Sequence, residues 1–247
     1  MIESLLLTTA RLCTYLGGKL LTAASSFFFE RDGRLYLVTS RHVLHDPLHG
    51  HEPDRVEFEL HRDASQLSNV ATVSMPLYRS GVAAWHQAED SGGEVDVAVL
   101  EVGRQLLPEG AMFHRFTPDN LAGALEQVEA GSPILVPGYP LGFYDTVHRL
   151  PVLRSGCIAS SFGVRFQGKG YFLTDARTHR GSSGSPVVQR LNVARPALPW
   201  RLLGVHSSRM DMLNRDVDAD ESLGLNSVWY ADVLLTLTAV NADTPSP

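Results

Sequence analysis

The sequence predicts an all-β protein, and three observations lead to this prediction. Short strand-like runs of apolar residues recur along the chain, with turn residues between them. The pair Asp32-Gly33 stands between two such runs, which is a strong hairpin signal. The longest helix-like pattern comes only near the end of the chain, so alternating strand–helix–strand units are not expected. Short strands joined by turns are typical of β-barrels or a β-sandwich.

The expected elements follow from this pattern in chain order. The strand-like segments are Leu5–Leu12, Ser25–Glu30, Leu35–Thr39, Val56–Leu60, Val70–Pro76, Val95–Val102, Pro133–Val136, Leu150–Ser161, Tyr171–Thr174, Pro186–Gln189 and Arg201–Val205. The polar, turn-rich stretch Pro108–Gly131 indicates a connection, with a short helix at Leu121–Glu129. Apolar residues at helical spacing predict a helix over Ser227–Val240.

Bulk composition excludes several classes of protein. A chain of 247 residues fits one domain or two small fused ones. The net charge of −6 argues against nucleic acid or an anionic membrane surface as a partner. Charged residues make up 19 %, which is below the usual ~25 % and indicates a folded chain. No apolar run is long enough to span a membrane.

Cysteine content and the N-terminus bear on the compartment. Cys13 and Cys157 are the only two cysteines, a small number that favours a reducing environment or a chain that does not rely on bridges. The alternative is a single Cys13–Cys157 bridge. The chain begins with acidic Met1-Ile2-Glu3-Ser4, and its apolar run Leu5-Leu6-Leu7 is too short for a signal peptide. We therefore expect a cytoplasmic protein.

The most informative stretch is Gly181-Ser182-Ser183-Gly184-Ser185-Pro186. Small residues on both sides of Ser183 allow a tight turn that leaves its hydroxyl exposed. The same turn aims the amides of Gly181 and Ser183 at one point, where a carbonyl oxygen that becomes negative can be held. Because a serine alone is a weak nucleophile, this interpretation requires a histidine and a carboxylate nearby.

Both partners are present, in an order that distinguishes between folds. His42 lies in Leu37-Val38-Thr39-Ser40-Arg41-His42-Val43-Leu44, at the end of an apolar strand-like run. Asp96 is the single acid within Val95-Asp96-Val97-Ala98-Val99-Leu100. The order His, Asp, Ser is one of the known triad orders, whereas an α/β-hydrolase needs Ser, Asp or Glu, then His. No Asp or Glu lies between Ser183 and the only downstream histidine, His206, so the hydrolase alternative is excluded.

Two other clusters suggest metal sites but are better explained as loops. His45, His49 and His51 are separated by proline and glycine, which prevent a helix from presenting them together. The acidic run 216–220 lacks the glycine and the glutamate of a calcium-binding loop. We expect no metal and no organic cofactor.

The three motifs together resemble those of trypsin-like serine proteases of the chymotrypsin fold, in particular the bacterial HtrA and glutamyl endopeptidase group. The matching segments are Thr39-Ser40-Arg41-His42-Val43, Asp96-Val97-Ala98-Val99-Leu100, Thr174-Asp175-Ala176 with 181–186, and Val136-Pro137-Gly138-Tyr139-Pro140-Leu141-Gly142. The resemblance spans roughly residues 5–240. It implies two six-stranded antiparallel β-barrels with a C-terminal α-helix: a first barrel over 1–110, a connection over 111–129, a second barrel over 130–225, and a helix and tail over 226–247.

The resemblance also implies a reaction, which is hydrolysis of peptide bonds in a polypeptide substrate. His42 would act as the general base, Asp96 would orient it, Ser183 would attack, and Gly181 and Ser183 would form the oxyanion hole. An acyl-enzyme would form and then be hydrolysed by water. The alternative is a trypsin-like fold without catalytic activity that serves as a protein-binding or regulatory module.

The substrate pocket gives a further expectation. Glutamyl endopeptidases have Thr or Ser five residues before the nucleophile and a histidine on a later strand, which Thr178 and His206 match. Ser207 would line the same wall, and Arg177 and Arg209 would add positive charge at the base and rim. Together these residues predict a preference for Glu or Asp before the scissile bond.

Overall fold

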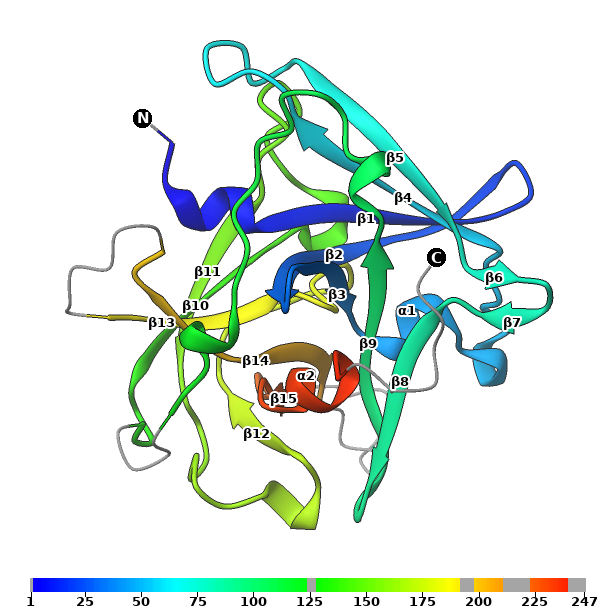
Figure 1. Ribbon diagram of the computed structural model, residues 1–247. Helices are drawn as coiled ribbons and strands as arrows, with labels where there is room; N and C mark the ends of the chain where they lie inside the picture. Colours follow the sequence, from blue (N-terminus) through cyan, green and yellow to red (C-terminus); the bar gives the residue numbers. More distant parts are fainter. Residues whose placement is uncertain (1, 124–127, 192–197, 211–222, 240–247) are drawn as a thin grey trace, which may run out of the picture.

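The structure, a computed structural model, describes residues 2–123, 128–191, 198–210 and 223–239 and contains two large antiparallel sheets (Figure 1). The first sheet has the strand order β5-β4-β1-β2-β3-β9-β8. Its strands are β1 (Thr9–Leu16), β2 (Lys19–Arg31), β3 (Arg34–Thr39), β4 (Arg55–His61), β5 (Val70–Pro76), β8 (Trp85–Asp90) and β9 (Gly93–Val102). A separate small hairpin pairs β6 (Tyr78–Arg79) with β7 (Val82–Ala83).

The second sheet has the order β11-β10-β13-β14-β15-β12. Its strands are β10 (Pro133–Gly138), β11 (Val152–Cys157), β12 (Tyr171–Thr174), β13 (Pro186–Arg190), β14 (Trp200–Arg209) and β15 (Asn226–Tyr230). The all-β expectation is confirmed. The first sheet has seven strands rather than the six expected, because Trp85–Asp90 pairs with β9 as a further strand. The domain boundaries stay a prediction.

The turn predicted at Asp32-Gly33 joins β2 to β3. Asp32 has φ 52° and Gly33 has φ 75°, so both central residues are left-handed. A two-residue turn of this kind matches the twist of the strands it connects. The resulting register pairs Phe27 with Val38 and Arg31 with Arg34.

Three clusters of buried apolar side chains form the core. One lies within the first sheet, around Phe28, Phe58 and Leu100, and another lies within the second sheet. The largest cluster contains residues of both sheets, including Phe27 and Val97 from the first and Val205 from the second. The two sheets therefore share an apolar core in addition to their own.

The C-terminal helix is shorter than the sequence pattern predicts. Helix α2 covers Val233–Leu237, whereas Asn226–Tyr230 forms strand β15. The expectation of a helix from Ser227 was wrong because this segment pairs with β12 on one side and β14 on the other. Its Val-Trp-Tyr sequence suits a strand that has neighbours on both sides. The last expected helical residue, 240, lies outside the described residues.

Two other expectations near chain connections also differ. Ser4–Thr8 forms a 3₁₀ turn, and the strand expected from Leu5 begins only at Thr9. Leu121 forms a bridge with Leu202 instead of starting a helix, while residues 124–127 of the expected helix lie outside the described part.

Both cysteines are free thiols. Among the described residues, no helix has the length and apolar character needed to cross a membrane.

Candidate active site

The turn Gly181–Pro186 lies at the start of β13 and has the tight geometry expected for it. The Ser182 amide donates to the His179 carbonyl at 3.0 Å, and the Ser185 amide donates to the Ser182 carbonyl at 3.0 Å. Gly181 has φ 92° and Gly184 has φ 83°, a left-handed conformation that suits glycine. A Cβ at Gly184 would also collide with the Ser25 carbonyl oxygen, so only glycine fits there.

Ser25 of β2 fixes this turn to the first sheet. Its amide donates to the Ser183 carbonyl at 3.0 Å, and its hydroxyl donates to the Gly181 carbonyl at 2.8 Å. The same hydroxyl accepts a hydrogen bond from the Tyr139 amide at 3.0 Å. One fully buried serine thus connects the nucleophile turn, the first sheet and the end of β10.

His42 and Asp96 are in direct contact. Strand β3 ends at Thr39, and His42 lies in the single turn of helix α1 (Arg41–Leu44) that follows. Asp96 lies on β9, which pairs with β3 up to Thr39. Asp96 Oδ2 is 2.7 Å from His42 Nδ1, and Asp96 Oδ1 accepts from the His42 amide at 2.9 Å. With Nδ1 donating to the carboxylate, Nε2 is left as the acceptor that a general base needs.

The electrostatics of the pair are those of a base and its orienting acid. Burial disfavours the imidazolium, but the hydrogen bond and the charge of Asp96 outweigh it and raise the pKa of His42. Burial disfavours the Asp96 carboxylate too. Its hydrogen bonds to His42 and Ser207, together with the His42 charge, nevertheless lower the pKa of Asp96. The acid therefore stays ionised beside the histidine.

Ser183 reaches this pair through Ser207. The Ser183 hydroxyl donates to the Ser207 carbonyl at 3.0 Å, and the Ser207 hydroxyl donates to Asp96 Oδ2. Among the described contacts, the Ser183 hydroxyl has no hydrogen bond to His42. Rotation of the Ser183 side chain would therefore have to precede any proton transfer to His42. Such contacts often tighten only when substrate binds.

The amides of Gly181 and Ser183 are available as donors. Within the described part of the chain, neither amide has a hydrogen-bond acceptor. The Arg180 carbonyl, in contrast, accepts from the Leu141 amide at 2.5 Å. In a trans peptide the carbonyl and the following N–H point in opposite directions, so the Gly181 N–H points away from Leu141.

The residues expected in a substrate pocket lie in different environments. Thr178 is buried and its hydroxyl donates to Asn226 Oδ1 at 2.5 Å, while the Asn226 amide group donates to the Ala176 and Thr174 carbonyls. His206 is 2 % exposed, and its Nδ1 has no partner in the described part of the chain. Burial, with a smaller effect of the His42 charge, lowers the pKa of His206 to about 4, so this ring is neutral near pH 7.

Arg177 and Arg209 are exposed, which suits the rim of a pocket rather than its base.

Comparison with known proteins shows the family of the chain. The sequence profile of the trypsin-like peptidase domain matches residues 24–193, more than half of the chain. The chain belongs to the trypsin-like peptidase family. No curated protein matches the sequence.

Solved structures share the fold of this trypsin-like peptidase. An HtrA-type protease solved with a tripeptide is similar over 94 % of this chain and 58 % of its own, at 16 % identity and a TM-score of 0.56. A serine endoprotease from Yersinia pestis is similar over 94 % of this chain and 61 % of its own, at 14 % identity and a TM-score of 0.55. The chain thus spans about three fifths of the length of these two proteins, and at such identities the likeness is one of fold.

Sequence reasoning missed three contributors to the site of this trypsin-like peptidase. Ser25 carried no signal, because it is one of several small residues in a strand. Ser207 was expected at the pocket wall, but its hydroxyl contacts Asp96 instead. The backbone of His206 receives hydrogen bonds from the Ser40 hydroxyl at 3.0 Å and the Gly184 amide at 2.8 Å. All three contacts join segments far apart in sequence, so no local motif could indicate them.

Two of the histidines that follow His42, His49 and His51, have separate partners. His49 Nδ1 is 2.7 Å from Asp46 Oδ2, and His51 Nε2 is 2.8 Å from the Val43 carbonyl. Among the described residues, no three metal-ligating side chains are grouped together. The acidic run 216–220 lies outside the described residues.

Proposed function

We propose that this trypsin-like peptidase hydrolyses peptide bonds with His42 as general base, Asp96 as its orienting acid and Ser183 as nucleophile. The observation that carries the proposal is the contact of both Asp96 oxygens with His42. The hydrogen bond from the Ser207 hydroxyl to the same carboxylate supports it, because this bond helps to hold Asp96 in place. In this arrangement His42 Nδ1 donates its hydrogen bond to Asp96, and Nε2 is left to accept the proton of Ser183.

The reaction would begin when the Ser183 hydroxyl turns from the Ser207 carbonyl to His42 Nε2. The oxygen attacks the substrate carbonyl carbon while its proton moves to His42. His42 then gives that proton to the leaving amine as the C–N bond breaks, which leaves an acyl group on Ser183. Water, deprotonated by His42, displaces the acyl group and returns Ser183 to its starting state.

The amides of Gly181 and Ser183 would hold the oxyanion of both tetrahedral intermediates. Their lack of another acceptor supports this role. Removal of one such donor typically lowers the rate by about 10²–10³-fold. The engagement of the Arg180 carbonyl by Leu141 would keep the Gly181 N–H in place without reorganisation during the reaction.

We further propose a preference for Glu or Asp before the scissile bond. His206 supports this preference, because a buried neutral imidazole with an unpartnered nitrogen offers a hydrogen bond to an incoming carboxylate. The exposed Arg177 and Arg209 would attract the negative charge of the substrate carboxylate at the rim of the substrate pocket. A panel of fluorogenic peptides tests the preference, and equal cleavage after Glu, Leu and Lys would contradict it.

The alternative function is a binding or regulatory module without catalysis. One observation favours it: the Ser183 hydroxyl is bonded to the Ser207 carbonyl rather than to His42.

The two free thiols suit a reducing compartment under either function, and we propose a cytoplasmic location.

Labelling with a fluorescent fluorophosphonate separates the two functions. The wild type is expected to become labelled and Ser183→Ala to remain unlabelled, because only an activated serine reacts. Ser182→Ala is the matched control, since it removes the neighbouring hydroxyl and should keep the label. A folded wild type that does not react, or equal labelling of Ser183→Ala, would contradict the proposal that the protein is an active serine peptidase.

A further inference from the structure

A hollow in the molecule lies outside the proposed active site. It has a volume of about 350 Å³, at the lower end of the range of ~300–1,000 Å³ usual for ligand pockets. It lies between the end of β8, the segment 162–170, the end of β15 and helix α2. None of the three proposed triad residues lines it.

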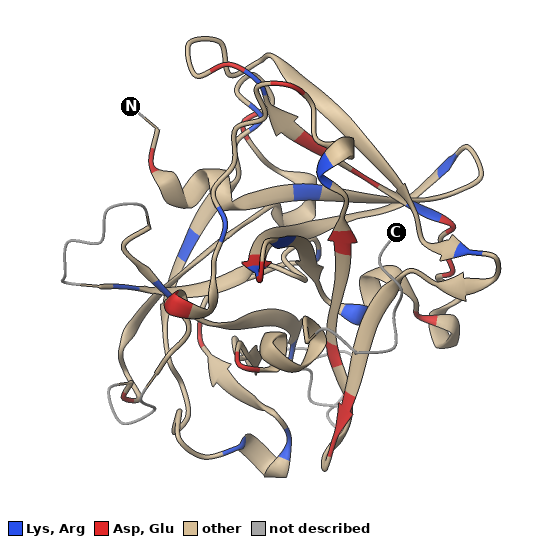
Figure 2. Cartoon of the chain, in the orientation of Figure 1, with Lys and Arg blue, Asp and Glu red and all other residues tan. Residues whose placement is uncertain are grey.

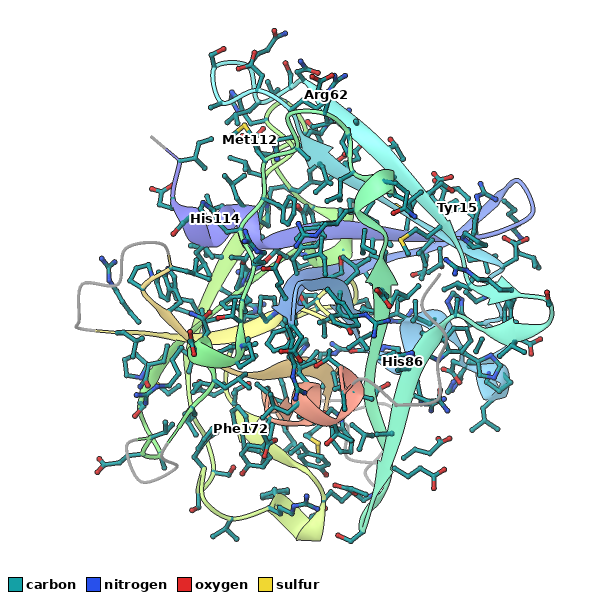
Figure 3. All side chains as sticks on the ribbon, viewed as in Figure 1. Tyr15, Arg62, His86, Met112, His114 and Phe172 are labelled. Carbon is teal, nitrogen blue, oxygen red and sulfur yellow. The ribbon has the colours of Figure 1, made fainter. Side chains whose placement is uncertain are left out.

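The walls of this cavity are fixed by contacts among themselves. The Tyr230 hydroxyl donates to the Phe162 carbonyl at 2.5 Å, and the two rings lie 5.1 Å apart, edge to face. Gly170 leaves room where a Cβ would lie 2.6 Å from Asp90 Oδ2 and 3.1 Å from the Trp229 ring. His86, labelled in Figure 3 beside α2, has its Nδ1 3.0 Å from the Leu237 carbonyl and ties β8 to the helix. The cavity is therefore preformed.

Its lining is aromatic and negatively charged. Three carboxylates, those of Glu89, Asp90 and Asp232, line it together with one guanidinium, Arg165. Arg165 Nη1 is 2.9 Å from Asp90 Oδ2, so these two charges compensate each other. Figure 2 shows the acidic residues at the free end of the β8–β9 hairpin.

The other two carboxylates have no such compensation. Within the described residues, the side chains of Glu89 and Asp232 have neither a hydrogen bond nor an ion pair. The charge of Asp232 acts on the aromatic wall: burial and then this negative charge raise the pKa of Tyr230 to about 12. Two negative charges are therefore left unbalanced around an aromatic hollow.

We propose that this cavity binds an arginine or lysine side chain presented by a polypeptide segment. The cationic group would lie between Glu89 and Asp232 and against the faces of the aromatic rings, where a cation is attracted electrostatically. The apolar stem of such a side chain would contact Val95 and Val233. An acidic ligand would be repelled, and a purely apolar one would leave both carboxylates without a partner.

The cavity also borders the strand that holds Asp96. Val95 lines the hollow, and the next residue along β9 carries the carboxylate that contacts His42. Along a strand successive side chains point to opposite faces, so an occupant would contact β9 from the side opposite Asp96.

Binding at this cavity requires no catalytic turnover, so it goes beyond the proposed function and can be tested in a protein that does not cleave.

The experiment measures binding by isothermal titration calorimetry with the full chain carrying Ser183→Ala. The probe is the acetylated and amidated pentapeptide Gly-Leu-Arg-Leu-Gly, and its matched control has citrulline, the uncharged isostere, in place of arginine. The double variant Glu89→Gln, Asp232→Asn removes both unbalanced charges without changing the shape. Thr236→Phe fills the cavity from an exposed position on α2. Glu3→Gln with Glu109→Gln removes the same net charge at exposed positions elsewhere.

The arginine peptide is expected to bind, and the citrulline peptide to bind at least several-fold more weakly. The double variant should weaken the arginine peptide by about tenfold, since it removes two partly exposed ion pairs. Thr236→Phe should abolish binding of the arginine peptide. The control variant Glu3→Gln with Glu109→Gln should bind it with unchanged affinity. No binding to the parent protein, equal affinity for both peptides, or unchanged affinity in the folded double variant would overturn the proposal. None of these results depends on whether the wild type reacts with a fluorophosphonate.

Discussion

At the scale of single residues, Asp96 is the most constrained group of the site. Its two oxygens accept three hydrogen bonds, from the His42 ring, the His42 amide and the Ser207 hydroxyl. Its carboxylate is held in one orientation, which selects the imidazole tautomer with a proton on Nδ1. A neutral amide at this position would preserve the shape but favour the wrong tautomer.

Asp96→Asn is therefore expected to lower kcat by roughly 10⁴-fold with a small effect on KM. Steady-state hydrolysis of a peptide substrate measures both constants. Asp63→Asn, at a partly exposed position outside the site, is a control for the loss of one charge and should keep wild-type kinetics. A loss of less than about tenfold in Asp96→Asn would show that Asp96 does not orient the base.

The raised pKa of His42 sets the pH dependence of the reaction. Catalysis needs neutral His42, and its interaction with Asp96 favours the protonated form. The rate should consequently increase with pH around a midpoint above the ordinary histidine value of about 6.5. The acidic limb of kcat/KM against pH gives this midpoint. A midpoint clearly below pH 6 would mean that Asp96 does not stabilise the imidazolium.

At the scale of elements, the nucleophile turn is supported from the opposite sheet. Strand β2 contributes Ser25, whose hydroxyl joins the Gly181 carbonyl to the Tyr139 amide, and α1 is tied to β14 by Ser40. The turn itself contains two left-handed glycines and two local hydrogen bonds, from the amides of Ser182 and Ser185. Its position relative to His42 depends in addition on the contact between the two sheets.

Ser25→Ala should destabilise the protein by about 1–3 kcal/mol, because it leaves a buried amide and a buried carbonyl without partners. It should also slow labelling of Ser183 by fluorophosphonate, since the turn loses its support. Ser26→Ala is the matched control: its buried hydroxyl bonds only to the Ala10 carbonyl within the first sheet. Urea unfolding and labelling rates are measured on both variants. Equal labelling rates at similar stability would contradict the supporting role of Ser25.

The elements also show what sequence can predict and what it cannot. The β2–β3 hairpin was predictable because Asp32-Gly33 determines its turn locally. Strand β8 was missed because four of its six side chains are polar and three of these are exposed, so no apolar alternation indicates it. The helical pattern from Ser227 was misleading, since pairing of β15 with two neighbours overrides local periodicity. His42, Asp96 and Ser183 were identified from their motifs, but their connection through Ser207 depends on long-range packing.

At the scale of the whole molecule, the two sheets are not independent units. The largest apolar cluster includes Phe27 and Tyr36 of the first sheet and Val205 and Trp229 of the second. The proposed catalytic residues are divided in the same way. Asp96 lies on β9 of the first sheet and His42 in helix α1 that follows β3, whereas Ser183 lies in the turn before β13 of the second sheet. A common core therefore holds together the two halves of the site.

We expect both sheets to unfold in one transition. Trp85 reports on the first sheet, whereas Trp200 and Trp229 belong to the shared cluster. Trp85→Phe leaves the two tryptophans of the shared cluster as reporters, and a double variant with Phe at 200 and 229 leaves Trp85. In each variant the denaturant midpoint from fluorescence should equal the midpoint from far-UV circular dichroism of the same variant. Separate fluorescence and dichroism midpoints in either variant would show that the sheets unfold independently.

The central claim is that the Ser183 hydroxyl can leave the Ser207 carbonyl and work with His42. A crystal structure of the protein treated with an aryl phosphonate tests it most directly. We expect phosphorus bonded to Ser183 Oγ, one phosphonyl oxygen accepting from the amides of Gly181 and Ser183, and His42 Nε2 within hydrogen-bonding distance of the adduct while Nδ1 stays on Asp96. An unmodified Ser183 still bonded to Ser207, or an adduct that His42 and both amides fail to contact, would contradict the account.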